Sequence, residues 1–247
     1  MRTASKLIVV ILLSICSFGF LEDSKNSLGK INFILGRPDE VHILPQDQDE
    51  WRQARLYAPV FNGDKVNTKQ ESRCEIKLTD FSVIRIGENS TFQVNKNLAK
   101  TGGESRLSVG KIWLNIKSLF DKEQFAIKTP TAVCAIRGTI LRIEADSSTN
   151  IAVYEGAVDV GPVWGASEQL KQQQEKQTKS LKPFEVPGPY EIPPPFEVTL
   201  DQWIRIVQGY QIEIRRDGKY AKKKIDEAED QKSDWIKWNQ MRDESAE

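Results

Sequence analysis

Residues 125–145 read FAIKTPTAVCAIRGTILRIEA, an apolar run interrupted by Thr-Pro and then by Arg-Gly-Thr. Pro130 has no N–H to give to a sheet, so it belongs at the start of a strand or at an edge. From Val133 onward, period-two alternation puts Cys134 and Ile136 on a core face. Gly138 lies on that face without a side chain, which predicts a close approach or a bend between two strands.

Arg137 and Thr139 fall on the opposite face, together with small residues. The planar guanidinium of Arg137 has five donors, which suit either an anion or the carbonyls of neighbouring loops. The sequence favours the second role, a clamp that holds a corner, since no second basic residue converges on it.

The same alternation recurs in short segments from about residue 26 to 163, each bounded by turn residues. Many short amphipathic strands predict a mainly β domain, either solenoid-like or sandwich-like. The pattern does not choose between these two architectures.

The composition is that of a folded protein without a basic excess. The 247 residues carry 35 Lys and Arg against 35 Asp and Glu, with 39% hydrophobic residues. Proteins that bind the phosphate backbone of nucleic acids carry an excess of basic residues, so nucleic acid is not expected as a partner.

The first 19 residues predict an export signal. Arg2 and Lys6 precede an apolar stretch, and Ser17-Phe18-Gly19 suits cleavage after Gly19. An uncleaved anchor and a lipid on Cys16 are the alternatives, and either would attach the protein to a membrane. We therefore expect a periplasmic or otherwise extracytoplasmic protein.

Residues that would carry catalysis or bind a metal do not form a known motif. His42 is the single histidine, and no nucleophile motif accompanies it. Cys74 and Cys134 lie in strand patterns, where a buried free thiol is favoured over a disulfide. Without a Cys/His cluster, neither a zinc site nor another cofactor is expected, and the chain is not expected to be an enzyme.

The C-terminal third differs in composition. Residues 164–198 are polar and then proline-rich, which predicts a linker or an extended strap. Residues 199–247 predict a helical extension: a first helix at 199–210 with a Thr199–Gln202 capping box, a hairpin-like turn at Asp217-Gly218, and a charged final helix. Trp203 is expected to dock on the β domain. Trp235 and Trp238 are expected either to dock as well or to form a partner-binding edge.

The residues from about 28 to 161 resemble the FecR domain, the extracytoplasmic domain of regulators that relay signals to sigma factors. The matching segments are FNGDKVNT (61–68), CEIKLTDFSVIRIGENSTFQV (74–94), GKIWLNI (110–116), the opening stretch (125–145) and VYEGAVDV (153–160). Asp80-Phe81 and Cys134 depart from the family pattern. The family positions, expected to be structural, are Gly63, Asp64, Thr68, Thr129, Pro130, Arg137, Gly138, Thr139 and Gly156.

The resemblance implies a stack of short strands with one or two C-terminal helices and a non-catalytic role. Regulators of this family carry a cytoplasmic sigma-binding segment, whereas six residues precede the apolar run here. The chain therefore resembles a stand-alone exported FecR-domain protein, a binding or sensing module for an envelope protein or glycan. A membrane-tethered regulator in sigma-factor signalling and a structural envelope scaffold are the alternatives.

Overall fold

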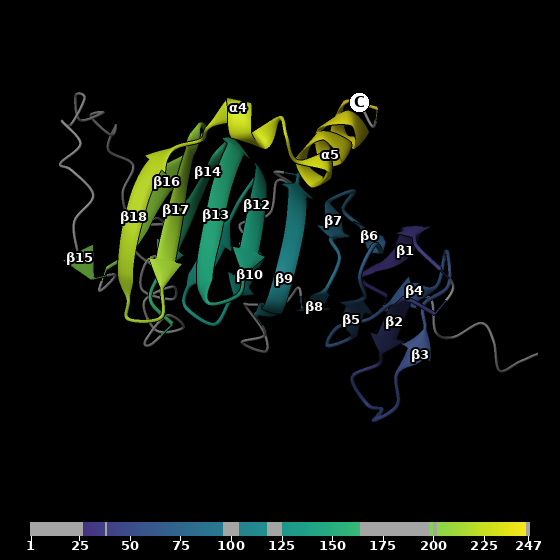
Figure 1. The fold of residues 1–247 in the computed structure, drawn as a ribbon. Helices are drawn as coiled ribbons and strands as arrows, with labels where there is room; N and C mark the ends of the chain where they lie inside the picture. The colour runs from purple at the N-terminus through teal and green to yellow at the C-terminus, as the bar shows by residue number, and fades with distance from the viewer. Residues whose placement is uncertain are drawn as a thin grey trace, which may run out of the picture.

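The fold is a sandwich of two β-sheets, seen in a computed structural model that describes residues 27–37, 39–95, 104–117, 125–163, 198–199 and 202–245. Figure 1 shows β12, β13, β17 and β18 in front of β10, β14 and β16. The main apolar cluster draws its members from both sheets, so the core lies between them. The prediction of a mainly β protein is confirmed, in its sandwich form.

The first sheet pairs its strands antiparallel throughout. In spatial order they are β4 (Pro59–Val60), β1 (Gly29–Leu35), β6 (Arg73–Leu78), β7 (Val83–Ile86), β9 (Ser105–Ile116), β12 (Thr139–Ala145), β13 (Ser148–Glu155), β17 (Tyr210–Arg215), β18 (Lys219–Lys224) and β15 (Val198–Thr199).

The second sheet contains one parallel pair, β9 with β10, among antiparallel ones. Its order is β3 (Arg52–Gln53), β2 (Val41–Leu44), β5 (Lys65–Thr68), β8 (Ser90–Gln93), β9, β10 (Phe125–Lys128), β11 (Val133–Ile136), β14 (Ala157–Gly161) and β16 (Ile204–Val207). The long strand β9 belongs to both sheets and joins the two layers.

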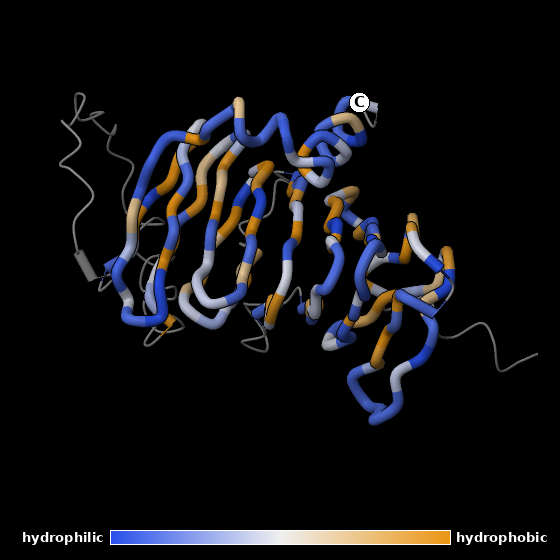
Figure 2. The backbone as a smooth tube through the Cα atoms, viewed as in Figure 1, coloured by the Kyte–Doolittle hydropathy of each residue, from blue (hydrophilic) through white to orange (hydrophobic). Residues whose placement is uncertain are grey.

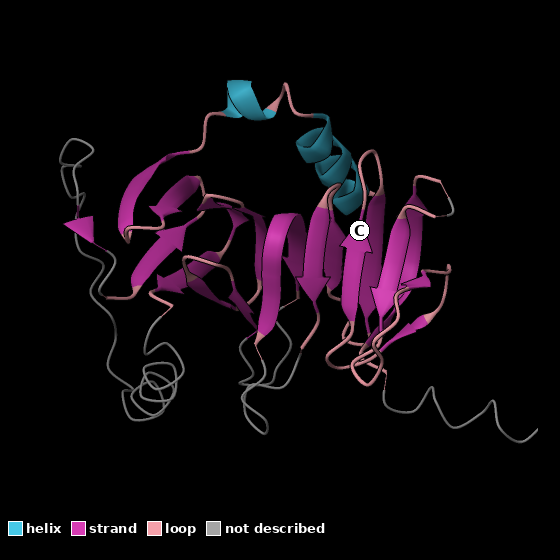
Figure 3. Cartoon of the chain, turned by 60° about the horizontal axis from the view of Figure 1, so that its bottom comes forward, coloured by secondary structure: helices cyan, strands magenta, loops and turns pink. Residues whose placement is uncertain are grey.

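Two short helices complete the described chain, α4 (Glu227–Asp230) and α5 (Asp234–Glu244). Figure 3 shows both helices on the same side of the strands. Neither helix in the described part of the chain has the length and apolar character needed to cross a bilayer.

The Arg-Gly-Thr triplet is the corner where the chain passes from the second sheet to the first. Strand β11 ends at Ile136, Gly138 has a φ of 57°, and β12 begins at Thr139. The Thr139 hydroxyl lies 3.0 Å from the carbonyl of Arg137 and 2.8 Å from that of Ala157. The bend expected at Gly138 is therefore confirmed.

The return crossing lies directly beside this corner. Strand β13 of the first sheet gives way to β14 of the second at Gly156, which has a φ of 80°. A Cβ added to Gly156 would lie 2.6 Å from the carbonyl oxygen of Gly138, closer than real Cβ contacts come. The two crossings fit together because both positions are glycine.

The faces predicted around Cys134 are also confirmed. Cys134 and Ile136 belong to the main core, whereas Val133 and Ala135 face outward and are covered by Trp203. Along the strands in Figure 2, hydrophobic and hydrophilic positions alternate in this way. Trp203 thus docks on the β-sandwich, as expected.

The clamp expected of Arg137 is wrong, because its side chain is exposed. The corner is held by the backbone at Gly138 and by the hydroxyl of Thr139. A strand ending on a bend projects its last polar side chain outward, and period-two alternation gives no information on that projection.

The helix expected at residues 199–210 is also wrong. Ile204–Val207 is strand β16, which pairs with β14, and Thr199 lies in β15. The Ile-Arg-Ile-Val run fits period two as well as it fits a helical face, and β-branched residues favour the strand. The expected turn at Asp217-Gly218 does join β17 to β18, and this hairpin extends the first sheet beside β13. The proline-rich strap and the export signal fall outside the described residues.

A turn with buried threonines ties the two layers at the Thr-Pro motif. Pro130 is exposed in the turn between β10 and β11, while the Thr129 hydroxyl lies 3.0 Å from the main-chain nitrogen and oxygen of Ala132. Thr131 Oγ1 lies 2.7 Å from Thr149 Oγ1 of β13. The motif therefore closes a hairpin of the second sheet and bonds it to the first.

A matched pair of substitutions tests the corner. Gly138→Val should lower the free energy of unfolding by about 1–3 kcal/mol, because a β-branched residue is strained at a positive φ. Arg137→Met should change it by less than about 0.5 kcal/mol, because the side chain is exposed. Urea denaturation followed by circular dichroism measures both, and a larger loss for Arg137→Met would restore the clamp.

Candidate functional site

The outer face of the first sheet carries a row of four buried polar or aromatic side chains. Glu75 pairs across the strands with Arg85, Arg85 with Trp113, and Trp113 with Arg142. Their chain neighbours point into the core, so alternation turns these four side chains away from it. Their relative exposures are nonetheless only 3%, 1%, 1% and 7%. Something outside the sheet must cover them.

Helix α5 is that cover. It begins after Ser233, whose hydroxyl accepts a hydrogen bond from the Ile236 N–H at 3.4 Å. Trp235 and Ile236 pack on Trp113, and the ring of Trp238 lies 5.8 Å from that of Phe33. These apolar contacts seat the first two turns of the helix on the sheet.

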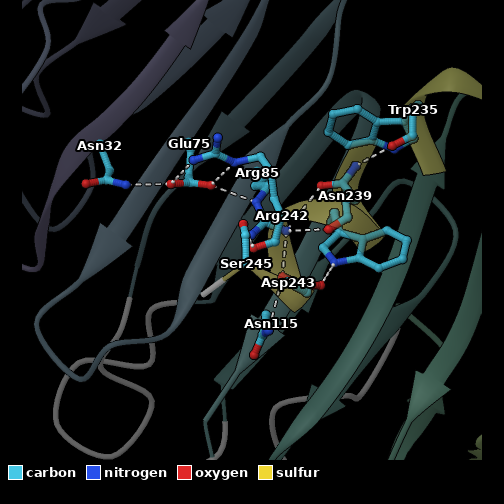
Figure 4. Close-up of polar contacts among 10 residues, drawn as sticks. Asn32, Glu75, Arg85, Asn115, Trp235, Asn239, Arg242, Asp243 and Ser245 are labelled. Atoms are coloured by element: carbon cyan, nitrogen blue, oxygen red, sulfur yellow. Dashed lines mark hydrogen bonds and ion pairs between the residues drawn. The ribbon is translucent and has the colours of Figure 1, made fainter. Parts of the chain in front are cut away.

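The second half of the helix is held by Glu75. Arg85 Nε donates to the Glu75 carboxylate at 2.7 Å from the neighbouring strand. From α5, Arg242 donates Nε and Nη2 to the two carboxylate oxygens at 3.0 and 3.1 Å, and Asn32 adds a bond of 2.6 Å. Figure 4 shows Glu75 between Asn32 on one side and the two arginines on the other. The carboxylate is satisfied on both oxygens.

The pKa of Glu75 follows from these contacts. Burial by itself would raise it, but hydrogen bonds from Arg242, Arg85 and Asn32 and the charge of Arg85 outweigh burial and lower the pKa to about 2. Glu75 is therefore ionised throughout the neutral range.

Asp243 of α5 accepts hydrogen bonds from side chains of β7 and β9. It accepts from Arg85 Nη1 at 2.7 Å, from Trp113 Nε1 at 2.8 Å and from Asn115 Nδ2 at 3.1 Å. Arg85 Nη1 also lies 3.3 Å from the carbonyl oxygen of Asn239. The carboxylate fixes the position of the helix along the strands, since each of its donors comes from β7 or β9 (Figure 4).

Helix α4 repeats the arrangement over β12 and β13. Asp230 accepts from Arg142 Nη1 at 3.2 Å and from the Tyr154 hydroxyl at 2.7 Å. Burial raises the pKa of Tyr154, so this hydroxyl stays protonated and donates. In each helix, an aspartate thus accepts hydrogen bonds from an arginine and from an aromatic side chain of the sheet.

The two tryptophans proposed as a partner-binding edge face the sheet instead. Trp235 is 4% exposed, and Trp238 is half-buried with its ring 5.6 Å from that of Trp235. The guanidinium of Arg73 lies 4.9 Å from the Trp238 ring. The other expectation for these residues, docking on the sheet, is confirmed.

The family positions occupy separate turns and do not converge on one site. Gly63 and Asp64 precede β5, and Asp64 accepts from the Phe61 N–H at 2.8 Å and the Gln46 N–H at 3.3 Å. Burial raises the pKa of Asp64 despite these bonds. The Thr68 hydroxyl donates to the carbonyl of Gly87. Thr129 and Pro130 shape the β10–β11 turn, and Gly138, Thr139 and Gly156 shape the corner.

The two cysteines and the histidine lie in three different strands. Cys74 and Cys134 are free and buried, and burial raises the pKa of each thiol to about 12. His42 is half-buried in β2 opposite Gln53. Among the described residues, no three His, Cys, Asp or Glu side chains gather as a metal site would require. Cys16 lies outside the described residues.

The network around Glu75, Arg85 and Asp243 is the feature that sequence reasoning missed. Alternation placed Glu75 and Arg85 on a polar face, and such a face is normally solvated. One signal was present: Trp113 falls on that same polar face in GKIWLNI. A large aromatic among outward charges indicates that something covers the face.

Residues 64–159 match the family model described as FecR protein. The chain contains a FecR domain. Glu75, Arg85, Trp113 and Arg142 all lie within it, so α4 and α5 dock on a face of the FecR domain itself.

Comparison with solved structures finds weaker likenesses. Two crystal structures from Parabacteroides distasonis, both described as "a putative anti-sigma factor", are 14% identical with a TM-score of 0.44. The alignment covers 66% of this chain and 60% of theirs, so this chain spans about three fifths of their length. No curated protein matches the chain.

Replacing Arg85 tests the buried network. Arg85→Met should lower the free energy of unfolding by about 3–5 kcal/mol, because it leaves Glu75 and Asp243 partly unpaired under the helix. Arg205→Met is the control, since Arg205 forms an exposed pair with Asp159 at 2.9 Å and should cost less than about 1 kcal/mol. Equal losses in urea denaturation would contradict the role of Arg85.

Glu75 also predicts how stability depends on pH. Its pKa is about 2 in the folded chain against an ordinary 4.5, so its contribution is fully present above pH 4.5 and is lost as pH falls towards 2. The free energy of unfolding should drop by about 3 kcal/mol over that range on account of this group. Glu75→Gln should show a shallower decline, and parallel pH profiles for parent and variant would contradict the assignment.

Proposed function

We propose that this protein is a FecR-type regulator in sigma-factor signalling that acts outside the cytoplasm by binding another protein. The match of residues 64–159 to the FecR family carries this proposal. The same family resemblance supports the signalling role over the wider hypothesis of an envelope module that senses a protein or a glycan. It also favours signalling over a constitutive scaffold.

A binding role, without catalysis, is in keeping with the chemistry of the described residues. Both thiols have pKa values raised to about 12, which leaves them unreactive near neutral pH. Most of the family positions shape turns or the corner between the two sheets. These residues stabilise the fold, and a regulator that binds another protein needs a stable fold to present its surface.

The docked helix gives the module a defined outer surface. Lys237, Gln240 and Met241 are exposed on α5, and Met241 is 59% exposed. Because Arg242 and Asp243 fix the opposite side of the helix, these exposed residues keep one orientation. A partner would meet a preorganised helical surface on the FecR domain.

The test is genetic, in a bacterium that produces the chain. Deleting the gene should change the transcripts of one sigma-dependent group of promoters, and the full chain should restore them. The control is a chain without residues 1–19, which keeps the FecR domain in the cytoplasm and should not restore them. Mass spectrometry of the restored strain should find a mature chain that begins near Phe20.

Two outcomes would overturn the proposal. Transcripts unchanged by the deletion would leave an envelope sensor or scaffold without a link to sigma factors. Restoration by the chain without residues 1–19 would place the action in the cytoplasm.

A further inference from the structure

Two aromatic side chains stand out from the rest of the described surface. Phe81 is 69% exposed and Tyr57 is 65% exposed, the highest values among the large hydrophobic residues described. Both have a φ of 65°, in the left-handed region that bulky residues rarely adopt. The fold therefore holds two strained aromatic residues in water, and such strain concentrates at functional positions.

A lysine lies over each ring. Lys30 Nζ is 5.5 Å from the centre of the Tyr57 ring, and Lys77 Nζ is 5.9 Å from that of Phe81. Lys30 of β1 pairs directly with Lys77 of β6, so the two lysines are adjacent on the outer face of the first sheet. Together these four residues form a lysine–aromatic patch.

The backbone keeps the rings beside the lysines. The Tyr57 N–H donates to the carbonyl of Ile31 at 2.8 Å, and the Phe81 N–H donates to that of Leu78 at 3.1 Å. Each ring is thus anchored next to the strand that carries its lysine. The patch is part of the folded sheet.

Within the described part of the chain, the two charges of the patch have no counterion. Neither Lys30 nor Lys77 forms an ion pair with any described residue, although like charges opposite each other on a sheet are destabilising. On the same face, the arginine at position 85 is paired with two carboxylates. Two lysines with no carboxylate partner among the described residues are complementary to a protein that brings carboxylates.

We propose that the lysine–aromatic patch docks an acidic segment of a partner protein. Carboxylates of the segment would lie between the two ammonium groups, and an apolar side chain would cover the rings of Tyr57 and Phe81. Exposed aromatic residues are typical of protein interfaces, and the two lysines add charge complementarity to an acidic partner. Two lysines are too few to hold the protein on an anionic bilayer or a nucleic acid, which favours a protein partner.

The patch is separate from α5 and shares with the proposed function only the binding of a protein. Its test uses synthetic peptides and the full chain, without a sigma factor. A negative result would therefore remove the patch as a docking surface and leave the signalling role to its own genetic test.

The probes are three fluorescent peptides of equal length, with leucines at the same positions and glutamate, glutamine or lysine between them. Fluorescence anisotropy at low ionic strength gives the affinities. We expect the glutamate peptide to bind at least about tenfold more tightly than the glutamine peptide, and the lysine peptide not to bind, because opposite charges attract at short range. Added salt should weaken the binding.

Two double variants assign the binding to the patch. Lys30→Glu with Lys77→Glu should abolish binding of the glutamate peptide. Tyr57→Asn with Phe81→Asn should weaken it about fivefold or more, while melting no lower than the parent, since asparagine tolerates a positive φ. Lys223→Glu with Lys224→Glu on β18 is the control of equal charge change and should bind as the parent does.

Any of three results would overturn the proposal. The glutamine peptide could bind as tightly as the glutamate peptide, or the patch variants could bind as well as the β18 control. The third is binding to phosphatidylglycerol vesicles through the patch with no binding of the glutamate peptide, which would identify a lipid surface instead.

Discussion

The buried pair of Glu75 and Arg85 is the interaction on which the architecture of the outer face depends. Two charges removed from water are stable only if their remaining donors and acceptors are satisfied. The first sheet cannot satisfy them alone, because its strands supply Asn32 and little else to Glu75. Arg242 and Asp243 complete the set from more than 150 residues away along the chain. Helix α5 therefore completes the buried network of the FecR domain, although it lies beyond the matched residues 64–159.

This requirement explains why α5 can dock with a modest apolar contact. Trp235 and Ile236 bury hydrophobic surface against Trp113, which favours association without fixing its geometry. The two residues at the far end of the helix then fix orientation, since a bidentate arginine and a multiply bonded aspartate tolerate little displacement. Burial brings the helix to the sheet, and the charges determine its register. Helix α4 has no buried residue, so its contact with the sheet depends on Asp230, which meets Arg142 and Tyr154.

The sequence predicted the parts of this structure that depend on local periodicity. Alternation identified the strands, the inward face of Cys134 and the bend at Gly138, because a strand's side-chain period and a glycine's freedom are local properties. It failed at Ile204–Val207, where the same four residues fit a strand and a helix and only the pairing with β14 decides. It also could not tell that the polar face at Glu75 is covered, because burial of a sheet face depends on which distant segment packs there. The exposure of Arg137 was missed for a different reason: strand β11 ends before it, and alternation does not describe where a side chain at the bend points.

The outward-facing charges of the first sheet have two contrasting environments. Arg85 is enclosed with two carboxylates of its own chain, so its charge contributes to folding and offers nothing to a partner. Lys30 of β1 and Lys77 of β6 lie on the same face as Arg85 and pair directly with each other, with no counterion among the residues that the structure describes. A chain with equal numbers of acidic and basic residues has carboxylates enough to pair them. In the described chain the arginine is paired, while the lysines lie beside strained, exposed aromatic rings without a carboxylate. Folding does not require this arrangement, and binding gives it a physical reason.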